Sequence, residues 1–236
     1  NMVDPETAAQ CIEAAGDVPV VFVNRFPGDP SVLNEKAVYV GSDEMTSGAF
    51  QGEFLAKFFK DQGKTDISYL MLNGILGQTS TTNRTASVLK ALEDNGIKAT
   101  AAAAPLAADY DRATAMDMIS PLLKTTKYDC IISNNDAMAL GAVEAMQQQG
   151  LDPKSVPIVG IDATADGRQA IKDGTLAMTV FQNAEGQGRA SLQAAANLID
   201  GKPIAEGTGY EVDDENEFII WVPFEPVTID NVADYD

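Results

Sequence analysis

The stretch SNNDAMALGAVEAM (residues 133–146) places two asparagines and an aspartate between two apolar segments. The segment YDCIIS, which runs into it, is short and β-branched, as in a buried strand, and the apolar residues after it recur at helical spacing. Asn134, Asn135 and Asp136 therefore lie where a predicted strand ends and a predicted helix begins. Asp136 or Asn135 could cap that helix, but a cap needs only one residue, which leaves the others for another role. Inside the helix, Gly141 indicates close packing on a sheet.

Predicted strands and helices alternate along most of the chain. The strands are, in order, VPVVFVN, AVYVGSD, ISYLMLNG, IKATAAAAPLA, YDCIIS, VPIVGID and LAMTVFQ, and two more, GYEV and EFIIWV, flank an acidic turn. The predicted helices cover residues 4–16, 44–62, 83–96, 111–123, 136–146, 167–174 and 183–201. Strands separated by helices imply parallel βαβ units, so the sequence predicts an α/β fold. The number of units is large for a single sheet, which favours two lobes.

Three local features carry further expectations. The helix over residues 44–62 is expected to have one apolar face, made of Phe50, Phe54, Leu55, Phe58 and Phe59. Pro121 should end or kink its helix near Ser120. Cys11 falls in a helical pattern and Cys130 in a strand, so both are predicted to be buried apolar residues rather than reactive thiols, and no disulfide is expected between them.

Polar side chains follow the predicted strands, at the edge where open parallel sheets bind ligands. They are Asn24, Arg25, Asn73, Asn134, Asn135, Asp136, Asp162, Gln182 and Asn183, and the loop after Asn73 reaches Arg84. Amide, carboxylate and guanidinium groups are planar and multidentate, which suits adjacent hydroxyl groups, so the set predicts a polyol-binding site. Each residue also has an ordinary interpretation: Asp162 in a turn, Asn183 as a helix cap, Arg84 as a solvated surface residue, and Tyr110 as a packing residue.

Composition excludes several classes of function. With 16 Lys plus Arg against 35 Asp plus Glu, the net charge of −19 repels a phosphate backbone, so nucleic acid is not an expected partner. Histidine is absent, which removes Ser-His-Asp and Cys-His catalysis and imidazole metal sites. We therefore expect no enzyme activity, no catalytic residue, no metal and no cofactor. No apolar run approaches the roughly 18 residues of a membrane span and no signal peptide is present, so the chain is either cytosolic or without its targeting segment.

Several segments resemble the galactose/glucose-binding proteins, type I periplasmic solute-binding proteins of sugar ABC transporters. The matching segments, in the family's order, are NMVDP, VPVVFVNRFP, VYVGSDEMTSGAFQGEFLAKFF, NNDAMALGAVEAM, VPIVGIDA, GTLAMTV and VPFEPV. The resemblance implies an α/β, two-lobed periplasmic-binding-protein type I fold with parallel sheets flanked by helices. It places the N-terminal lobe at residues 1–41 plus 183–222, and the C-terminal lobe at residues 42–182 plus 223–236.

The same resemblance implies a set of sugar-contacting residues. They are Asn1, Arg84, Asn135, Asp162 and Gln182, with Tyr110 as a stacking aromatic and with Gln78 and Ser80 at positions where the family carries histidine and aspartate. Asn135 would then reach the sugar, while Asp136 or Asn134 caps or braces the helix. The family's calcium loop is missing, so no structural calcium is expected.

The chain begins at NMVDP, where members of the resembled family have already completed two βα units. The N-terminal lobe is therefore expected to be incomplete, either because the chain is truncated or because the remainder is a separate chain. We expect a monomer at full length, and association of the truncated chain is possible because an edge strand or apolar face would be exposed.

The function implied by the resemblance is binding of a monosaccharide, a galactose- or glucose-like hexose, and its delivery to the membrane permease of an ABC transporter. The expected location is outside the cytoplasm, in the periplasm or lipid-anchored outside the cell membrane. The alternative is the effector-binding core of a LacI-type sugar-responsive transcription regulator, which shares this fold.

Overall fold

The computed structural model describes residues 1–2 and 4–235, and they form two compact units. The N-terminal unit consists of Asn1–Asp43 and Asn183–Phe224. The C-terminal unit consists of Glu44–Gln182 and Glu225–Asp236, of which the structure describes residues up to 235. The chain thus passes between the units three times. Among the described residues, no helix combines the length and the apolar character that crossing a membrane requires.

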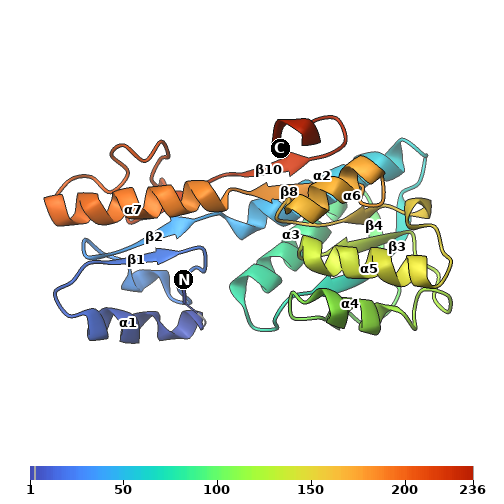
Figure 1. The fold of residues 1–236 in the computed structure, drawn as a ribbon, viewed down its shortest axis with the longest axis horizontal. Coiled ribbons are helices and arrows are strands. Elements are labelled where there is room, and N and C mark those ends of the chain that lie inside the picture. The colour runs from blue at the N-terminus through green and yellow to red at the C-terminus, as the bar shows by residue number, and fades with distance from the viewer. Residues whose placement is uncertain (3, 236) are drawn as a thin grey trace. The chain divides into compact units, whose positions relative to one another are not determined.

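The N-terminal unit is a small parallel sheet between helices (Figure 1). Its elements are the 3-10 turns Pro5–Thr7 and Pro30–Val32, helices α1 (Ala8–Ala15) and α7 (Ala184–Asp200), and strands β1 (Val20–Val23), β2 (Ala37–Gly41) and β9 (Ile219–Trp221). The strand order is β1-β2-β9, and both pairs are parallel. Because side chains alternate along β2, Tyr39 packs in a cluster with Ala8 of α1, whereas Val38 and Val40 pack with Ala190 of α7.

The two cysteines differ in exposure. Cys130 is buried in the C-terminal unit, and burial raises the pKa of its thiol. Cys11 is exposed, so the prediction of a buried side chain was wrong for this residue. The reason is that α1 is only eight residues long and buries a narrow face, formed by Ala8 and the partly buried Ile12, beside which Cys11 lies.

The acidic stretch after GYEV is a turn, as predicted, but GYEV itself is not a strand. It contributes only an isolated antiparallel bridge between Val212 and Ile220. Asp213 organises the turn instead, since its carboxylate accepts hydrogen bonds from the backbone N–H groups of Glu215 and Asn216 and from the indole of Trp221. These side-chain bonds accompany the bridge and two backbone hydrogen bonds beside it, from Asp213 to Ile219 and from Trp221 to Glu211, which are too few to form a strand.

The C-terminal unit is built around a parallel sheet of order β4-β3-β6-β7, with β5 also pairing with β3. Its strands are β3 (Asp66–Asn73), β4 (Lys98–Ala101), β5 (Leu106–Ala107), β6 (Cys130–Ser133), β7 (Ile158–Val159), β8 (Thr179–Gln182) and β10 (Phe224–Val227), the last two paired with each other. Its helices are α2 (Glu44–Lys60), α3 (Thr79–Asp94), α4 (Arg112–Ile119), α5 (Asp136–Gln148) and α6 (Ala165–Asp173), with 3-10 turns at Pro153–Ser155 and Val232–Tyr235. Helix α4 ends at Ile119, as Pro121 predicts.

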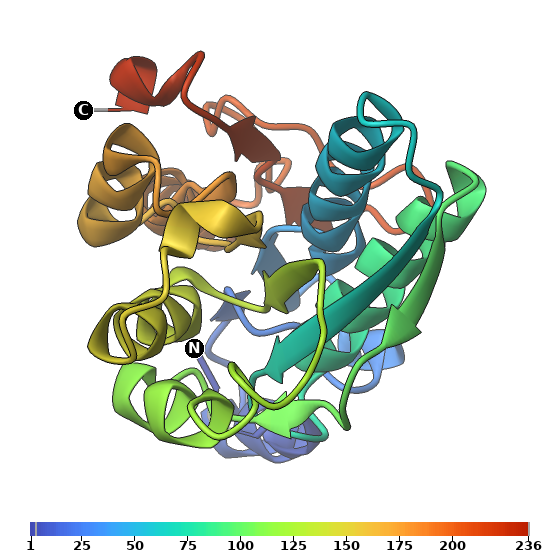
Figure 2. The same ribbon diagram turned by 90° about the vertical axis from the view of Figure 1, so that its right-hand side faces the viewer.

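Helices cover both faces of this sheet. Leu70, Leu72 and Ile131 share a core cluster with residues of α4 and α5. Met71 and Ile132, which alternate with them, are also buried, on the face opposite that cluster. Figure 2 shows the sheet of this unit with α4 and α5 on one side and α2 and α3 on the other. Strands β3, β6 and β7 are therefore mostly apolar and buried, with polar side chains at or after their carboxyl ends, whereas β4 is largely exposed.

Helices α2 and α3 approach each other closely, and this corrects the prediction of a phenylalanine face. Leu55 and Phe59 are buried, but Phe50, Phe54 and Phe58 are only half-buried. The other buried residues of α2 are mostly small or polar: Glu44, Ser47, Gly48, Gln51, Gly52 and Ala56. Small residues allow close backbone contact, which a face of aromatic rings would prevent. Gly141 has the same role in α5, but it packs on α4 rather than on the sheet, since a Cβ there would lie 2.3 Å from the carbonyl oxygen of Arg112.

We predict that Gly48→Ala lowers the free energy of unfolding by about 1–3 kcal/mol, the usual range for overpacking. A Cβ at Gly48 would lie 2.3 Å from the backbone oxygen of Arg84 and 3.0 Å from the backbone nitrogen of Val88, neither of which can move aside. The control is Gly188→Ala in α7, where a Cβ meets nothing within 4 Å; it should raise stability by roughly 0.5–1 kcal/mol. Urea unfolding monitored by circular dichroism measures both, and equal effects of the two variants would contradict the close contact.

Candidate functional site

The carboxyl ends of neighbouring strands in the C-terminal unit carry most of the polar residues singled out in the sequence, whereas Asn24, Arg25 and Asn183 belong to the N-terminal unit. Asn73 ends β3, Asn134 to Asp136 follow β6, and Asp162 follows β7. Strands β3, β6 and β7 are consecutive in the sheet, and an isolated parallel bridge joins Asp162 to Phe181 of β8, directly before Gln182. These side chains therefore start from one edge of one sheet.

Asn135 caps helix α5. Its Oδ1 accepts a hydrogen bond from the backbone N–H of Met138 at 3.0 Å, with extended backbone at the cap position. Of the residues considered as caps, Asn135 is therefore the one that caps the helix, so Asp136 and Asn134 are left with a bracing role. The contact of Asn135 with a sugar stays a prediction. The Nδ2 group of Asn135 makes no hydrogen bond within the described part of the chain, so the amide serves as a cap on one side and offers a donor on the other.

Asn134 braces the surrounding loops. Its Oδ1 accepts hydrogen bonds from the backbone N–H of Gly74 at 3.1 Å and from the hydroxyl of Thr85 at 3.4 Å. Its backbone oxygen accepts one from Nη1 of Arg84 at 2.7 Å. Asn134 is fully buried, so it joins the end of β3 and helix α3 to the strand-to-helix junction.

Asp136 is fully buried and has structural partners. Its carboxylate accepts hydrogen bonds from the hydroxyl of Thr179 at 2.6 Å and from the backbone N–H of Thr164 at 2.8 Å. Burial, and after it the negative charge of Asp162, raises the pKa of Asp136 to about 7. A Cβ at Gly160 would lie 2.3 Å from its Oδ1, so that glycine is required where the carboxyl group packs. Asp136 thus connects α5, β8 and the start of α6.

Arg84 is buried and ion-paired, so the interpretation as a solvated surface residue was wrong. Its Nε donates to Oε2 of Glu44 at 2.6 Å and its Nη2 donates to Oε1 at 3.2 Å, a two-point contact with one carboxylate. Only 6% of the Arg84 side chain and 10% of the Glu44 side chain are exposed. Burial alone would lower the pKa of Arg84, but the carboxylates of Glu44 and Asp162 raise it above its ordinary value, so the guanidinium keeps its charge.

Glu44 was not singled out as a site residue in the sequence. It is the first residue of α2, where an acidic side chain ordinarily stabilises the helix dipole, and Arg84 lies 40 positions away in the chain. The one available signal was the pattern of α2, because Gly48 lies one turn after Glu44 and permits the approach to α3 that brings the two side chains together.

Asp162 sits beside this ion pair in a constrained backbone. Its φ is 117° and that of Ala163 is 50°, both in a region that residues other than glycine rarely adopt. Its Oδ1 lies 3.8 Å from Nη1 of Arg84, and 27% of its side chain is exposed. Burial raises the pKa of Asp162 to about 6; Arg84 acts in the opposite direction and Glu44 adds to the increase. Strain of this kind costs about 1–3 kcal/mol and is concentrated at functional sites.

Tyr110 and Ser80 are brought together, whereas Gln78 is not joined to them. The hydroxyl of Tyr110 is 2.8 Å from Oγ of Ser80 and 2.9 Å from Oγ1 of Thr81. The ring of Tyr110 lies against Gly74, where a Cβ would come within 2.0 Å of the ring. Gln78 is the residue before α3, and its side chain makes no hydrogen bond within the described residues.

Gln182 is half-buried at the end of β8, and its backbone N–H donates to the carbonyl oxygen of Asp162 at 3.4 Å. Asn183 caps helix α7, with its Oδ1 accepting from the backbone N–H of Gly186 at 2.8 Å. The prediction that Asn183 is a cap is confirmed, which leaves Gln182 as the residue of this pair whose side chain is not used in capping.

Gln51 of α2 connects two of the strand ends from behind. Its Nε2 donates to the backbone oxygens of Ser133 and Gly160, both at 2.9 Å. The residue is fully buried, and its Oε1 has no hydrogen-bond partner in the described part of the chain. One amide group therefore fixes the separation of the segments that carry Asn134 to Asp136 and Asp162.

Asn1 belongs to the N-terminal unit, where it is exposed. Near it in the chain, Nη1 of Arg25 donates to the backbone oxygen of Met2 at 3.0 Å. The same unit holds an aromatic group that the sequence did not single out. The rings of Phe26 and Trp221 are stacked with centroids 6.0 Å apart, and each makes a T-shaped contact with the ring of Tyr39.

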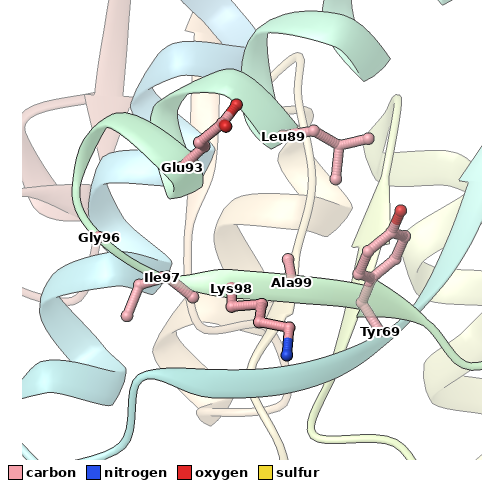
Figure 3. A pocket seen from close by; sticks show the side chains of 7 residues that line it. All are labelled: Tyr69, Leu89, Glu93, Gly96, Ile97, Lys98 and Ala99. Carbon is pink, nitrogen blue, oxygen red and sulfur yellow. The ribbon is translucent and has the colours of Figure 1, made fainter.

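Three pockets of the C-terminal unit lie away from these residues. A pocket of about 450 Å³ is lined by Tyr69, Leu89, Glu93, Gly96, Ile97, Lys98 and Ala99, between the end of α3 and strand β4 (Figure 3). None of the strand-end polar residues lines it. Within the described residues, no group of three or more Cys, Asp or Glu side chains is arranged to hold a metal ion.

The geometry thus defines an α/β protein of two units, one with a polar sheet edge centred on Glu44, Arg84 and Asp162. The model of the periplasmic binding protein domain family matches residues 1–203. The chain belongs to this family, and its fold is the type I periplasmic-binding-protein fold with parallel sheets flanked by helices.

Curated relatives and solved structures agree with this assignment. The chain is 36% identical over 250 residues to the D-galactose/methyl-galactoside binding periplasmic protein MglB of Haemophilus influenzae, covering 100% of the chain and 72% of the relative. It is 27% identical to the ribose import binding protein RbsB of Salmonella typhimurium, covering 86% of the chain and 66% of the relative. An ABC transporter solute binding protein from Bacillus halodurans, solved with bound myo-inositol, superposes with a TM-score of 0.80 at 30% identity, covering 100% of this chain and 75% of that one.

Proposed function

We propose that this protein binds a monosaccharide or a similarly sized cyclic polyol outside the cytoplasm and delivers it to the membrane permease of an ABC transporter. The observation that carries the proposal is the group of planar polar side chains at one edge of the sheet, with Asp162 3.8 Å from the guanidinium of Arg84. The relatives named above support the ligand class, because their names and titles refer to galactose, ribose and myo-inositol. No enzyme activity is part of this proposal.

The chemistry of these side chains suits hydroxyl groups. Asp162 is an acceptor when ionised, Nδ2 of Asn135 is a donor, and Arg84 presents donors. A sugar hydroxyl donates and accepts at once, so a polyol can pair with an acceptor and a donor on adjacent carbons. We propose that Gln182 and Asn1 add further polar contacts, and that Gln78 and Ser80 lie at the ligand's periphery.

An aromatic ring completes such a site, because the C–H face of a pyranose packs on a ring. Tyr110 is the candidate of the C-terminal unit, and its hydroxyl is already held by Ser80 and Thr81. A ring fixed in this way loses little conformational entropy on binding.

We further propose that the two compact units are the two lobes of a solute-binding protein. Three chain crossings join them, which suits lobes that change orientation when ligand binds. The permease would distinguish the liganded form from the unliganded one by that change. The full-length protein is expected to be a monomer.

The preferred ligand in this proposal is a galactose- or glucose-like hexose, supported by the 36% identity to the galactoside-binding relative. The sequence differs from that resembled family at Gln78, Ser80 and Gln182, and the named relatives cover several ligands, so a hexose is proposed as a class. The alternative of a LacI-type regulator has no support from these relatives, whose names describe binding and import.

Isothermal titration calorimetry of the full-length gene product tests this function. The panel should contain D-galactose, D-glucose, D-ribose, D-allose and myo-inositol, with sodium chloride as the blank titrant. We expect saturable binding of at least one member. The absence of binding across the panel would contradict the proposal.

Within that assay, we predict that Asp162→Asn weakens binding by about 1.5–3 kcal/mol, the range for hydrogen bonds to a charged group. Without ligand, the variant should be as stable as the wild type or more stable, since burial disfavours the ionised carboxylate in the empty site. The control is Asp166→Asn, a carboxylate 74% exposed on α6, which should leave affinity unchanged. A loss of apo stability with unchanged affinity would instead identify Asp162 as a turn residue only.

A further inference from the structure

The charge of Arg84 is already balanced before any ligand arrives. Glu44 holds the guanidinium through two hydrogen bonds of 2.6 and 3.2 Å, and the backbone oxygen of Asn134 accepts a third from Nη1 at 2.7 Å. In a binding site for carboxylates, an arginine presents its two-point edge to the ligand. Here that edge, Nε and Nη2, faces a carboxylate of the protein itself.

The remaining charge near the guanidinium is negative. Arg84 contributes one positive charge, and Glu44 and Asp162 contribute one negative charge each, so the three side chains have a formal net charge of −1. Asp136, which is buried behind them, adds further negative charge when it ionises. No lysine or second arginine is among the polar residues at the strand ends of this unit.

We infer that Glu44 sets the charge preference of the binding site: it occupies Arg84, so the site accepts neutral and ammonium-bearing polyols and rejects polyols that carry a carboxylate. This inference rests on the proposed function, since it concerns the ligand class of the same site. Glu44 acts as a specificity residue through Arg84 and needs no contact with the ligand itself.

The physical basis is the cost of placing like charges in a desolvated site. A ligand carboxylate within a few ångströms of Asp162 meets repulsion that is only weakly screened once the site is closed to solvent, and Arg84, the cation that pairs with Asp162, is already engaged by Glu44. A ligand ammonium group has the opposite effect, because it stabilises the ionised form of Asp162.

Glu44→Gln tests the effect of the carboxylate charge while the size of the side chain stays the same. The substitution keeps a side chain of the same size next to Arg84 but leaves the guanidinium without its balancing carboxylate. A ligand carboxylate can then supply the missing negative charge. The matched control is Glu53→Gln, which removes the same charge from an exposed position of the same helix.

The experiment measures dissociation constants for matched sets of ligands by calorimetry on the full-length gene product. Each set contains a neutral hexose, its hexosamine and its hexuronate, in the gluco and galacto configurations. For the wild type we expect the hexuronate to bind at least about a hundredfold more weakly than the hexose, which is about 2.7 kcal/mol. Glu44→Gln should lower the ratio of the hexuronate dissociation constant to the hexose dissociation constant about tenfold or more, which is about 1.4 kcal/mol. Glu53→Gln should leave this ratio unchanged.

A thermal shift assay gives an independent readout. The hexuronate should raise the melting temperature of Glu44→Gln and not that of the wild type. If Glu44→Gln does not fold, the inference is tested by the ratio of the hexuronate and hexose dissociation constants of the wild type. A hexuronate that binds the wild type within threefold of the hexose would overturn the inference while leaving sugar binding intact. Failure of every neutral sugar and hexosamine to bind would instead overturn the proposed function, and the inference with it.

Discussion

Arg84→Met will destabilise the C-terminal unit by about 3–5 kcal/mol, the cost of leaving a buried charge without its partner, and will abolish ligand binding. The substitution leaves the carboxylates of Glu44 and Asp162 facing each other in a buried place, with no cation between them. Urea unfolding monitored by circular dichroism measures the loss, and calorimetry measures binding.

Two further variants distinguish the effect of breaking the buried ion pair from the effect of removing an arginine side chain. Arg112→Met removes an arginine whose side chain is 39% exposed and whose partners are Glu144 and Asp166, so it should cost no more than about 1 kcal/mol. The double variant Glu44→Gln/Arg84→Met removes both members of the buried pair and should recover much of the stability. Equal losses for the two single arginine variants would show that burial of the pair has no energetic consequence.

The second large effect is a dependence of stability on pH that runs opposite to acid denaturation. The pKa of Asp136 is about 7 in the folded protein and 3.8 for an ordinary aspartate, so between these values the folded state holds a proton that the unfolded state has lost. The contribution of Asp136 to stability is therefore complete below about pH 4 and is lost as the pH rises towards 7. The increase in the pKa of Asp136 corresponds to a loss of about 4 kcal/mol in the free energy of unfolding between these pH values, at 1.36 kcal/mol for each pKa unit.

Asp136→Asn removes the contribution of Asp136 to this dependence, whereas Asp162, whose pKa is raised to about 6, keeps a contribution of the same sign. The variant should be less stable than or equal to the wild type at pH 4.5 and more stable than it at pH 8, as measured by urea unfolding at both values. The comparison of variant with wild type is necessary because Asp111 and Asp129, whose pKa values are lowered, contribute with the opposite sign. A constant difference between the two proteins at all pH values would mean that Asp136 does not titrate in this range.

The alternation of strands and helices could be predicted because burial on both faces leaves a plain record in the sequence. Parallel strands such as β3 and β6 contain continuous apolar runs, residues 69–72 and 130–132, and polar residues end or follow them. The position of Asn183 at the start of α7 identified it as a cap, and Pro121 marked the end of α4.

Contacts between elements could not be predicted from periodicity. The face of α2 was misassigned because phenylalanine is the stronger apolar signal, whereas Gly48 and Gly52 form the contact with α3. In the same way, Gly141 indicated a close contact but not that its partner is a helix. The sequence pattern indicates that a glycine makes a close contact, but only the folded structure shows which element is its partner.

The polar site was predicted in outline and missed in its charge arrangement. Asn135 and Asp162 follow strands, so their proximity follows from the sheet, whereas Arg84 lies within helix α3. The capping role could not be resolved because Asn134, Asn135 and Asp136 can each accept from a first turn, and backbone angles decide among them. The pairing of Arg84 with Glu44 depends on the distance between two helices, which no local pattern encodes.

Substitution of Gln51 could change the ligand that the protein binds without any substitution of the polar residues at the sheet edge. Its amide holds the backbone oxygens of Ser133 and Gly160 from behind the sheet edge. Exchange of this one residue for a shorter or longer one changes the separation of two loops, and with it the distance between the groups they carry. Divergence of specificity among descendants of such a protein can therefore begin at a fully buried residue, and a mutational survey restricted to contact residues would overlook its first step.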